Sequence, residues 1–133
     1  MIQLDGIKEV KSMQNNLTVQ QIQQDIKVAL ETVMGDSSPE MLDEMSSIFL
    51  EDAVPLFEQM KLGLATSDFK AINVAAHTLK GSSATIGLEK FAGLCLALEL
   101  SSKGQETSKI GPYIAELETE YITIEEALRH FLL

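Results

Sequence analysis

Apolar residues recur at helical spacing along most of the chain, and clusters of glycine, proline, serine and aspartate separate the periodic segments. These clusters lie at residues 35–39, 66–68 and 104–112. Long segments with a period near 3.6 residues, bounded by such breakers, are typical of amphipathic helices. No alternating pattern typical of a half-buried strand competes with them. The pattern therefore predicts an all-α fold.

The first two helices have recognisable start and stop signals. Thr18 is a good N-cap for a first helix that ends at Gly35. Ser38 followed by Pro39 predicts the start of a second helix, because proline is well tolerated at the first helical position. Its apolar period continues beyond Pro55, so we expect the proline to bend this helix rather than to end it.

The last three helices follow in the same way. Ser67 or Asp68 caps a third helix that ends near Gly87. A fourth helix spans residues 88–103 and is apolar nearly all round, so it should be central or should face a partner on one side. The last helix runs from about Pro112 to the C-terminal end of the chain.

Long amphipathic helices joined by short loops pack most simply as an antiparallel up-down four-helix bundle, here with an additional N-terminal helix. We expect one bundle domain over residues 18–133, preceded by an arm at residues 1–17 that is loose or forms a short helix. The length of 133 residues leaves no room for a second domain. Met1 followed by a polar arm favours a free-standing protein over an excised module.

Charge and composition narrow the function. A net charge of -10 argues against nucleic acid as a partner, because binding it requires clustered lysine and arginine. No apolar run approaches the roughly 20 residues that a membrane span needs, and no secretion signal is visible. The single cysteine, Cys95, excludes an internal disulfide and lies in an apolar run typical of core. These features predict a monomer in a reducing cytoplasm.

His77 lies on the polar side of the third predicted helix. At about 100° per residue, the apolar positions of this segment form one stripe nearly opposite the histidine. These positions are Phe69, Ile72, Ala75, Leu79 and Ile86. His77 therefore points away from the core, where a large partner can reach it.

The neighbours of His77 suit a nucleophile. A largely unprotonated imidazole at neutral pH can attack an electrophile through one ring nitrogen, while a hydrogen bond at the other sets the tautomer. Lys80, three residues later, lies close enough to offer positive charge to an arriving phosphoryl group. Gly81 removes a side chain where a partner must approach, although a mid-helix glycine costs about 1 kcal/mol relative to alanine. The adjacent Ser82 and Ser83 rotate toward the packing side and are read as small packing residues.

The segment at residues 76–88, AHTLKGSSATIGL, closely resembles the histidine-containing phosphotransfer (HPt) domain of multistep two-component phosphorelays. Leu94-Cys95 and Leu98-Glu99 after it, and Met34-Gly35-Asp36, Phe49-Leu50-Glu51 and Pro55 before it, also match that family's pattern. The resemblance covers roughly residues 18–131, and the His-x-x-Lys-Gly-Ser block with its flanks is fairly specific.

The resemblance implies a phosphoacceptor role for His77, charge stabilisation by Lys80 and clearance at Gly81. Many members carry a glutamine that orients the imidazole, and Glu99 occupies the matching position here. A carboxylate can accept a hydrogen bond from the imidazole N–H, but it also repels an incoming phosphoryl dianion. We expect Glu99 to lie near His77, with orientation of the imidazole as its candidate role.

The resemblance also implies partners. Response-regulator receiver domains and a hybrid histidine kinase would exchange the phosphoryl group with this chain. The chain has no phosphate-binding loop and no clustered aspartates near His77, so we expect Mg²⁺ and the acidic pocket to come from the receiver. It is therefore predicted to be a phosphocarrier without an ATP site of its own, not an enzyme. The alternative is a helical adaptor that docks a receiver or kinase without accepting phosphate.

Overall fold

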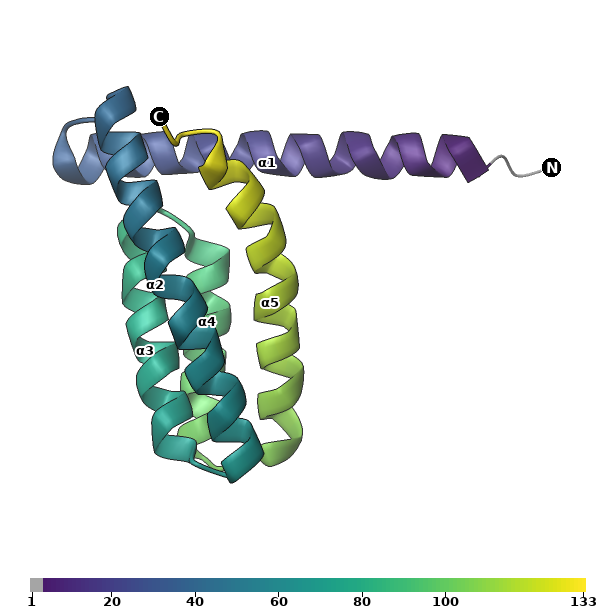
Figure 1. The fold of residues 1–133 in the computed structure, drawn as a ribbon, viewed down its shortest axis with the longest axis vertical. Coiled ribbons are helices and arrows are strands. Elements are labelled where there is room, and N and C mark those ends of the chain that lie inside the picture. Colours follow the sequence, from purple (N-terminus) through teal and green to yellow (C-terminus); the bar gives the residue numbers. More distant parts are fainter. Residues whose placement is uncertain (1–3) are drawn as a thin grey trace.

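The chain folds as four helices packed side by side with a fifth lying across one end (Figure 1). The structure is a computed structural model that describes the backbone of residues 4–133 and the side chains of residues 18–133. Its helices are α1 (Leu4–Met34), α2 (Pro39–Thr66), α3 (Phe69–Thr85), α4 (Glu89–Lys103) and α5 (Thr107–Arg129). Helices α2 to α5 alternate in direction, and α1 crosses the end at which α2 begins. The all-α antiparallel bundle with an additional N-terminal helix is confirmed.

The core receives side chains from every helix. Fully buried residues include Ile26 of α1, Met60 of α2, Leu79 of α3, Leu98 of α4 and Leu117 of α5. Burial of one such side chain contributes about 1.5–3 kcal/mol, so the bundle is stabilised chiefly by these contacts between helices. Four aromatic rings contact one another and join α2, α4 and α5: Phe49, Phe57, Phe91 and Tyr121.

The junction of α2 and α3 explains how the third helix is set in place. The backbone of Ser67 has a positive φ of 54° and ends α2, while the side chain of Asp68 accepts a hydrogen bond from the Ala71 N–H and begins α3. Asp68, rather than Ser67, is therefore the cap of α3. Just before this turn, a Cβ at Gly63 would lie 2.7 Å from Cγ1 of Ile72, so the glycine lets α2 and α3 approach closely.

The start of α2 also agrees with the prediction from the sequence. The side chain of Ser38 accepts a hydrogen bond from the Met41 N–H at 3.3 Å, and Pro39 is the first helical residue, as predicted. Pro55 lies inside α2, which continues to Thr66. The prediction that this proline does not end the helix is confirmed.

The predicted start of the first helix is wrong. Thr18, expected as the N-cap, lies inside α1, which begins at Leu4. No proline occurs between Leu4 and Met34, so every residue there has the N–H that a continuous helix requires. Residues 1–3 of the predicted arm lie outside the described part of the chain. The division into an arm at residues 1–17 and a domain at residues 18–133 stays a prediction.

The predicted start of the last helix is also wrong. Helix α5 begins at Thr107, and Pro112, which was expected near its start, lies inside it. Ile110 in the first turn is fully buried, and this packing holds the turn in helical form. The proline removes only a bond to the carbonyl of Ser108, an exposed residue whose carbonyl can be solvated instead.

Helix α1 rests on the turn between α3 and α4. Gly87 in this turn has a φ of +82°, and a Cβ there would lie 2.5 Å from Cβ of Ala29. Any side chain at position 87 would therefore both strain the backbone and push α1 away. This contact places α1 at the end of the bundle where α3 ends and α4 begins.

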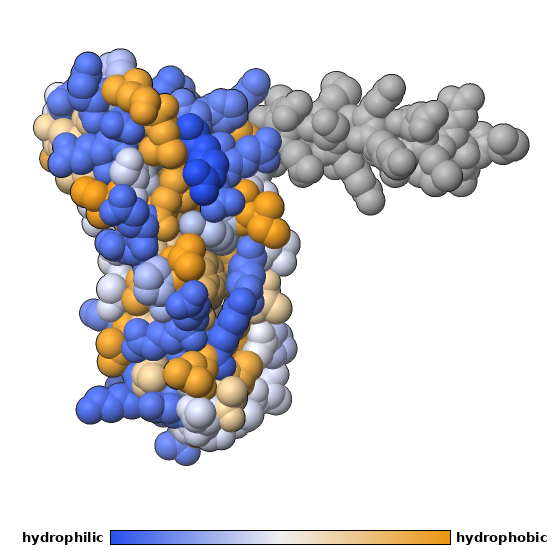
Figure 2. All heavy atoms as spheres, viewed as in Figure 1, coloured by the Kyte–Doolittle hydropathy of each residue, from blue (hydrophilic) through white to orange (hydrophobic). Residues whose placement is uncertain are grey.

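The face of the bundle formed by α2 and α5 has an apolar seam between these two helices (Figure 2). Val54 and Ile122 are about half or more exposed there, with Phe57 and Tyr121 beneath them in a groove of about 320 Å³. An ion pair of 2.7 Å between Lys61 and Glu118 joins the two helices.

Candidate functional site

His77 projects from the outer face of α3. Its side chain is 66% exposed, whereas Ala75, Ala76 and Leu79 around it are fully buried. The helix is thus held firmly by its inner face while the imidazole faces solvent. The prediction that His77 points away from the core is confirmed.

Glu99 of α4 holds one nitrogen of this imidazole. Its Oε1 lies 2.9 Å from Nδ1 of His77, and its side chain is only 18% exposed. An ionised carboxylate can only accept a hydrogen bond, so Nδ1 carries the proton. In a neutral ring this leaves Nε2 unprotonated, with its lone pair available to an electrophile. The expectation that Glu99 lies near His77 is confirmed.

Lys80 binds the other oxygen of the same carboxylate. Its Nζ donates to Oε2 of Glu99 at 2.7 Å from a side chain that is 29% exposed. The hydrogen bond from Lys80 lowers the pKa of Glu99 below its ordinary value; partial burial opposes this shift, and the hydrogen bond with His77 adds to it. Glu99 is therefore ionised at neutral pH, with a cation on one oxygen and an imidazole on the other.

Two further side chains fasten the backbone of Glu99. Asn73 of α3 donates from Nδ2 to the carbonyl oxygen of Glu99 at 2.9 Å, and Ser102 donates from Oγ to the same atom at 2.8 Å. Asn73 is one helical turn before His77, so its bond fixes the position of α4 relative to the histidine, whereas the Ser102 bond lies within α4. The sequence analysis assigned no role to Asn73 or Ser102. The only available signal was the spacing of four residues between Asn73 and His77.

Gly81 has open space where a side chain would stand. A Cβ built there meets no atom within 4 Å, apart from the helix's own backbone. Close packing within this molecule therefore does not require a glycine, although the residue lowers the helical propensity of α3. Its clearance role stays a prediction.

The neighbours assigned to packing lie where expected. Ser83 is fully buried and donates to the carbonyl of Leu79 at 2.7 Å, and Ser82 is half-buried. Cys95 is buried, and burial raises the pKa of its thiol to about 12. A thiol that stays protonated is a poor nucleophile. The core assignment of Cys95 is confirmed.

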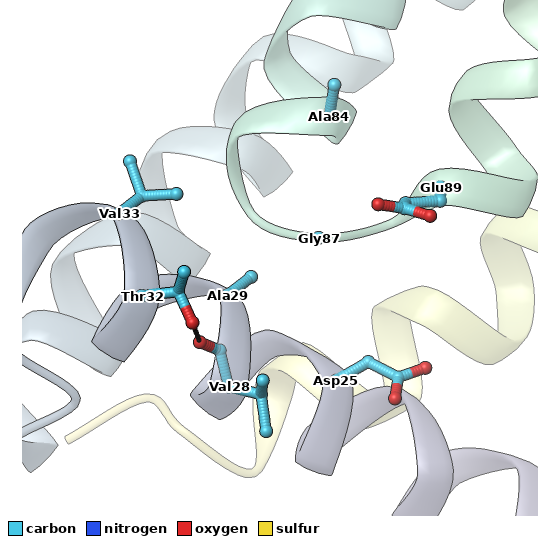
Figure 3. A pocket seen from close by; sticks show the side chains of 8 residues that line it. All are labelled: Asp25, Val28, Ala29, Thr32, Val33, Ala84, Gly87 and Glu89. Atoms are coloured by element: carbon cyan, nitrogen blue, oxygen red, sulfur yellow. Dashed lines mark hydrogen bonds between the residues drawn. The ribbon is translucent and has the colours of Figure 1, made fainter.

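A cavity lies between the C-terminal end of α3 and helix α1 (Figure 3). Ala84 lies two turns after His77 on the same face and lines this cavity, whose volume is about 430 Å³. Val28 and Val33 of α1 form another part of the lining, and each is more than half exposed. Asp25 and Glu89 also line the cavity, so its lining is mixed, with apolar and acidic side chains.

Within the described residues, no three histidine, cysteine, aspartate or glutamate side chains gather in a way that could hold a metal ion. The same part of the chain contains no helix with both the length and the apolar character needed to cross a bilayer.

Comparison with known proteins matches this arrangement. A family model described as the Hpt domain matches residues 44–127. Histidine-containing phosphotransfer protein 2 of Arabidopsis thaliana is 27% identical over 103 residues, which are 75% of this chain and 66% of that protein. Protein 1 of the same series and organism is 22% identical over 130 residues, covering 94% of this chain and 84% of the relative.

A solved structure is similar as well. The crystal structure of histidine-containing phosphotransfer protein B (HptB) from Pseudomonas aeruginosa PAO1 superposes with a TM-score of 0.64 at 26% identity. The match covers 79% of this chain and 88% of that one. The family model alone spans more than half of the chain and includes His77, Lys80, Gly81 and Glu99. The chain therefore belongs to the Hpt domain family.

Proposed function

We propose that His77 is the phosphoacceptor of this chain, which as an Hpt domain is an intermediate in a phosphorelay. The observation that carries the proposal is the hydrogen bond between Nδ1 and Glu99, because it leaves Nε2 exposed and unprotonated. Nε2 attacks the phosphorus of a receiver's aspartyl phosphate, and the N–P bond forms as the P–O bond breaks. The electron pair of the broken bond leaves with the aspartate carboxylate. The next receiver's aspartate takes the group by the reverse steps.

Glu99 acts as the counter-charge in this step. When Nε2 bonds to phosphorus, the proton remains on Nδ1 and the ring becomes cationic. The carboxylate 2.9 Å away stabilises that cation, which is a role that a neutral amide fills less well. The same carboxylate repels the phosphoryl oxygens, but Lys80 neutralises part of its charge through the 2.7 Å contact. By holding the proton on Nδ1, Glu99 orients the imidazole and lets the ring depart as neutral imidazole when the group is transferred onward.

Lys80 and Gly81 prepare the surface for the incoming group. Lys80 is one turn from His77, and its ammonium group supplies positive charge to phosphoryl oxygens at Nε2. Gly81 leaves room for the receiver's backbone next to the imidazole. The receiver would bring Mg²⁺, which neutralises charge on the transferring phosphoryl group.

The partners of this chain are receiver domains of response regulators and of a hybrid histidine kinase. A protein partner is supported by the open face at Gly81 and by the exposed Val28 and Val33 in the cavity between Ala84 and α1, because a receiver covering His77 would lie over both. We propose that the chain acts as a monomeric phosphocarrier in the cytoplasm, with no ATP site of its own. The phosphorylation-independent adaptor gains no support from the relatives.

A labelling experiment tests the proposal. A receiver phosphorylated with radioactive phosphate is mixed with the chain in the presence of Mg²⁺, and the label on the chain is tested for acid lability and base stability. We expect label in the wild type and none in His77→Gln. His130→Gln is the matched control, because it changes the other histidine at an exposed position near the end of α5. Label in His77→Gln equal to that in the control would show that another residue accepts the phosphoryl group.

A further inference from the structure

Two lysines near His77 differ from the other basic side chains of the described residues 18–133. Five of those side chains form ion pairs with carboxylates, and Lys27 lies over the ring of Phe131. The paired residues are Lys61, Lys80, Lys90, Lys109 and Arg129. Lys70 and Lys103 have neither kind of partner, although the chain carries twice as many acidic as basic residues. Their positive charge is therefore available to another molecule.

Both lysines line the same groove. It has a volume of about 450 Å³ and lies between the first turn of α3 and the last turn of α4. Phe69 and Leu100 supply apolar walls, and Leu100 is 58% exposed. Glu99, which binds His77, also lines the groove, so the groove adjoins the phosphoacceptor site.

The position of Lys70 has no advantage for folding. It is the second residue of α3, at the positive end of the helix dipole, where a cation is unfavourable. Lys103 lies in the last turn of α4, where a cation is favourable, so the dipole accounts for Lys103 alone. Lys70 is seven residues before His77 and thus lies on the same face of α3, two turns away. A partner that covers His77 can reach it.

Charge complementarity identifies the occupant. Most of this chain repels acidic groups because of its net charge of -10, whereas the groove places two unpaired cations beside exposed apolar surface. We propose that the groove binds a loop of the docking receiver that carries a carboxylate and an adjacent apolar side chain. Lys70 and Lys103 hold the carboxylate and so determine which receivers exchange phosphate with His77. This inference rests on the proposed function.

The test is a double charge reversal. Lys70→Glu with Lys103→Glu is compared with Lys90→Glu with Lys109→Glu, a control pair that changes the net charge equally outside the groove. Transfer from a phosphorylated receiver is measured against receiver concentration at several ionic strengths. We expect the groove variant to raise KM by about tenfold relative to the control, with a much smaller effect on kcat. The KM of the wild type should rise with salt more steeply than that of the groove variant.

Three additional measurements separate the outcomes. Circular dichroism establishes that both variants are folded, and labelling of His77 by phosphoramidate tests the nucleophile without a docked protein. A receiver whose acidic docking loop is reversed to lysine should recover the lost affinity for the groove variant. If the wild type takes label from the receiver but both variants show the same KM, the groove inference is overturned while the proposed function stands. If no receiver labels the wild type, both are overturned.

Discussion

Glu99→Gln tests the electrostatic role of this site with almost no change in shape. The substitution keeps an oxygen that can accept from Nδ1 of His77, at a contact of 2.9 Å in the wild type, but removes the negative charge. The contact of Lys80 with the carboxylate, 2.7 Å in the wild type, also loses its ionic character. Without the charged acceptor the phosphorylated imidazole holds its Nδ1 proton less firmly, and a ring without that proton is a poorer leaving group. The repulsion between carboxylate and phosphoryl oxygens also disappears. Both changes favour retention of the phosphoryl group.

The size of the effect follows from the strength of the hydrogen bond. A bond to a charged group contributes about 1.5–3 kcal/mol and a neutral bond about 0.5–1.5 kcal/mol, so the loss is about 1 kcal/mol. The side chain of His77 is 66% exposed, and solvent screening keeps the value at this lower end. One kcal/mol corresponds to about a fivefold change in rate. We expect the onward transfer from phosphorylated Glu99→Gln to be slower by about this factor.

The assay is the decay of radioactive label from purified phosphorylated protein, with and without a second receiver. Glu118→Gln serves as the control, because Glu118 forms an ion pair with Lys61 on the opposite face, between α2 and α5. The label should persist longer in Glu99→Gln than in either the control or the wild type. An equal or shorter lifetime would refute the idea that the carboxylate speeds loss of the phosphoryl group.

Two further predictions concern the same face. Gly81→Arg should abolish transfer from a receiver yet leave the melting temperature unchanged or raised, because the site has open space and arginine favours a helix more than glycine does. Gly93→Arg, at another glycine with open space in α4, is the control, and normal transfer by Gly81→Arg would place the docking face elsewhere. The second prediction is pH dependence: because the pKa of Glu99 is lowered in the folded chain, its stabilising effect is complete above the ordinary glutamate pKa of about 4.3 and is lost as the pH falls through the lower folded value. Urea unfolding should show a wild-type advantage over Glu99→Gln that shrinks as the pH is lowered below about 4; an advantage that is the same at pH 3 and pH 6 would contradict this.

Local sequence determined most of the helices and the direction of His77. The cap at Ser38 and Pro39 acts within a few residues, and the apolar stripe of α3 identifies its buried face without knowledge of the partner helices. The same reasoning failed where packing between distant segments prevailed. Burial of Ile110 holds the first turn of α5 ahead of Pro112, and no such contact is visible in a local pattern.

The relation of α3 to α4 was decided by the tertiary structure. The family resemblance placed Glu99 near His77, but its simultaneous contact with Lys80 and its attachment through Asn73 depend on how the two helices are aligned. The groove that brings Lys70 and Lys103 together depends on the same alignment. A helical pattern states which face of each helix is buried, whereas the alignment of one helix along another is set by the interlocking of side chains from both. The sequence by itself therefore determined a solvent-facing histidine on a helical bundle, and only the packing of α3 against α4 decided which charges surround it.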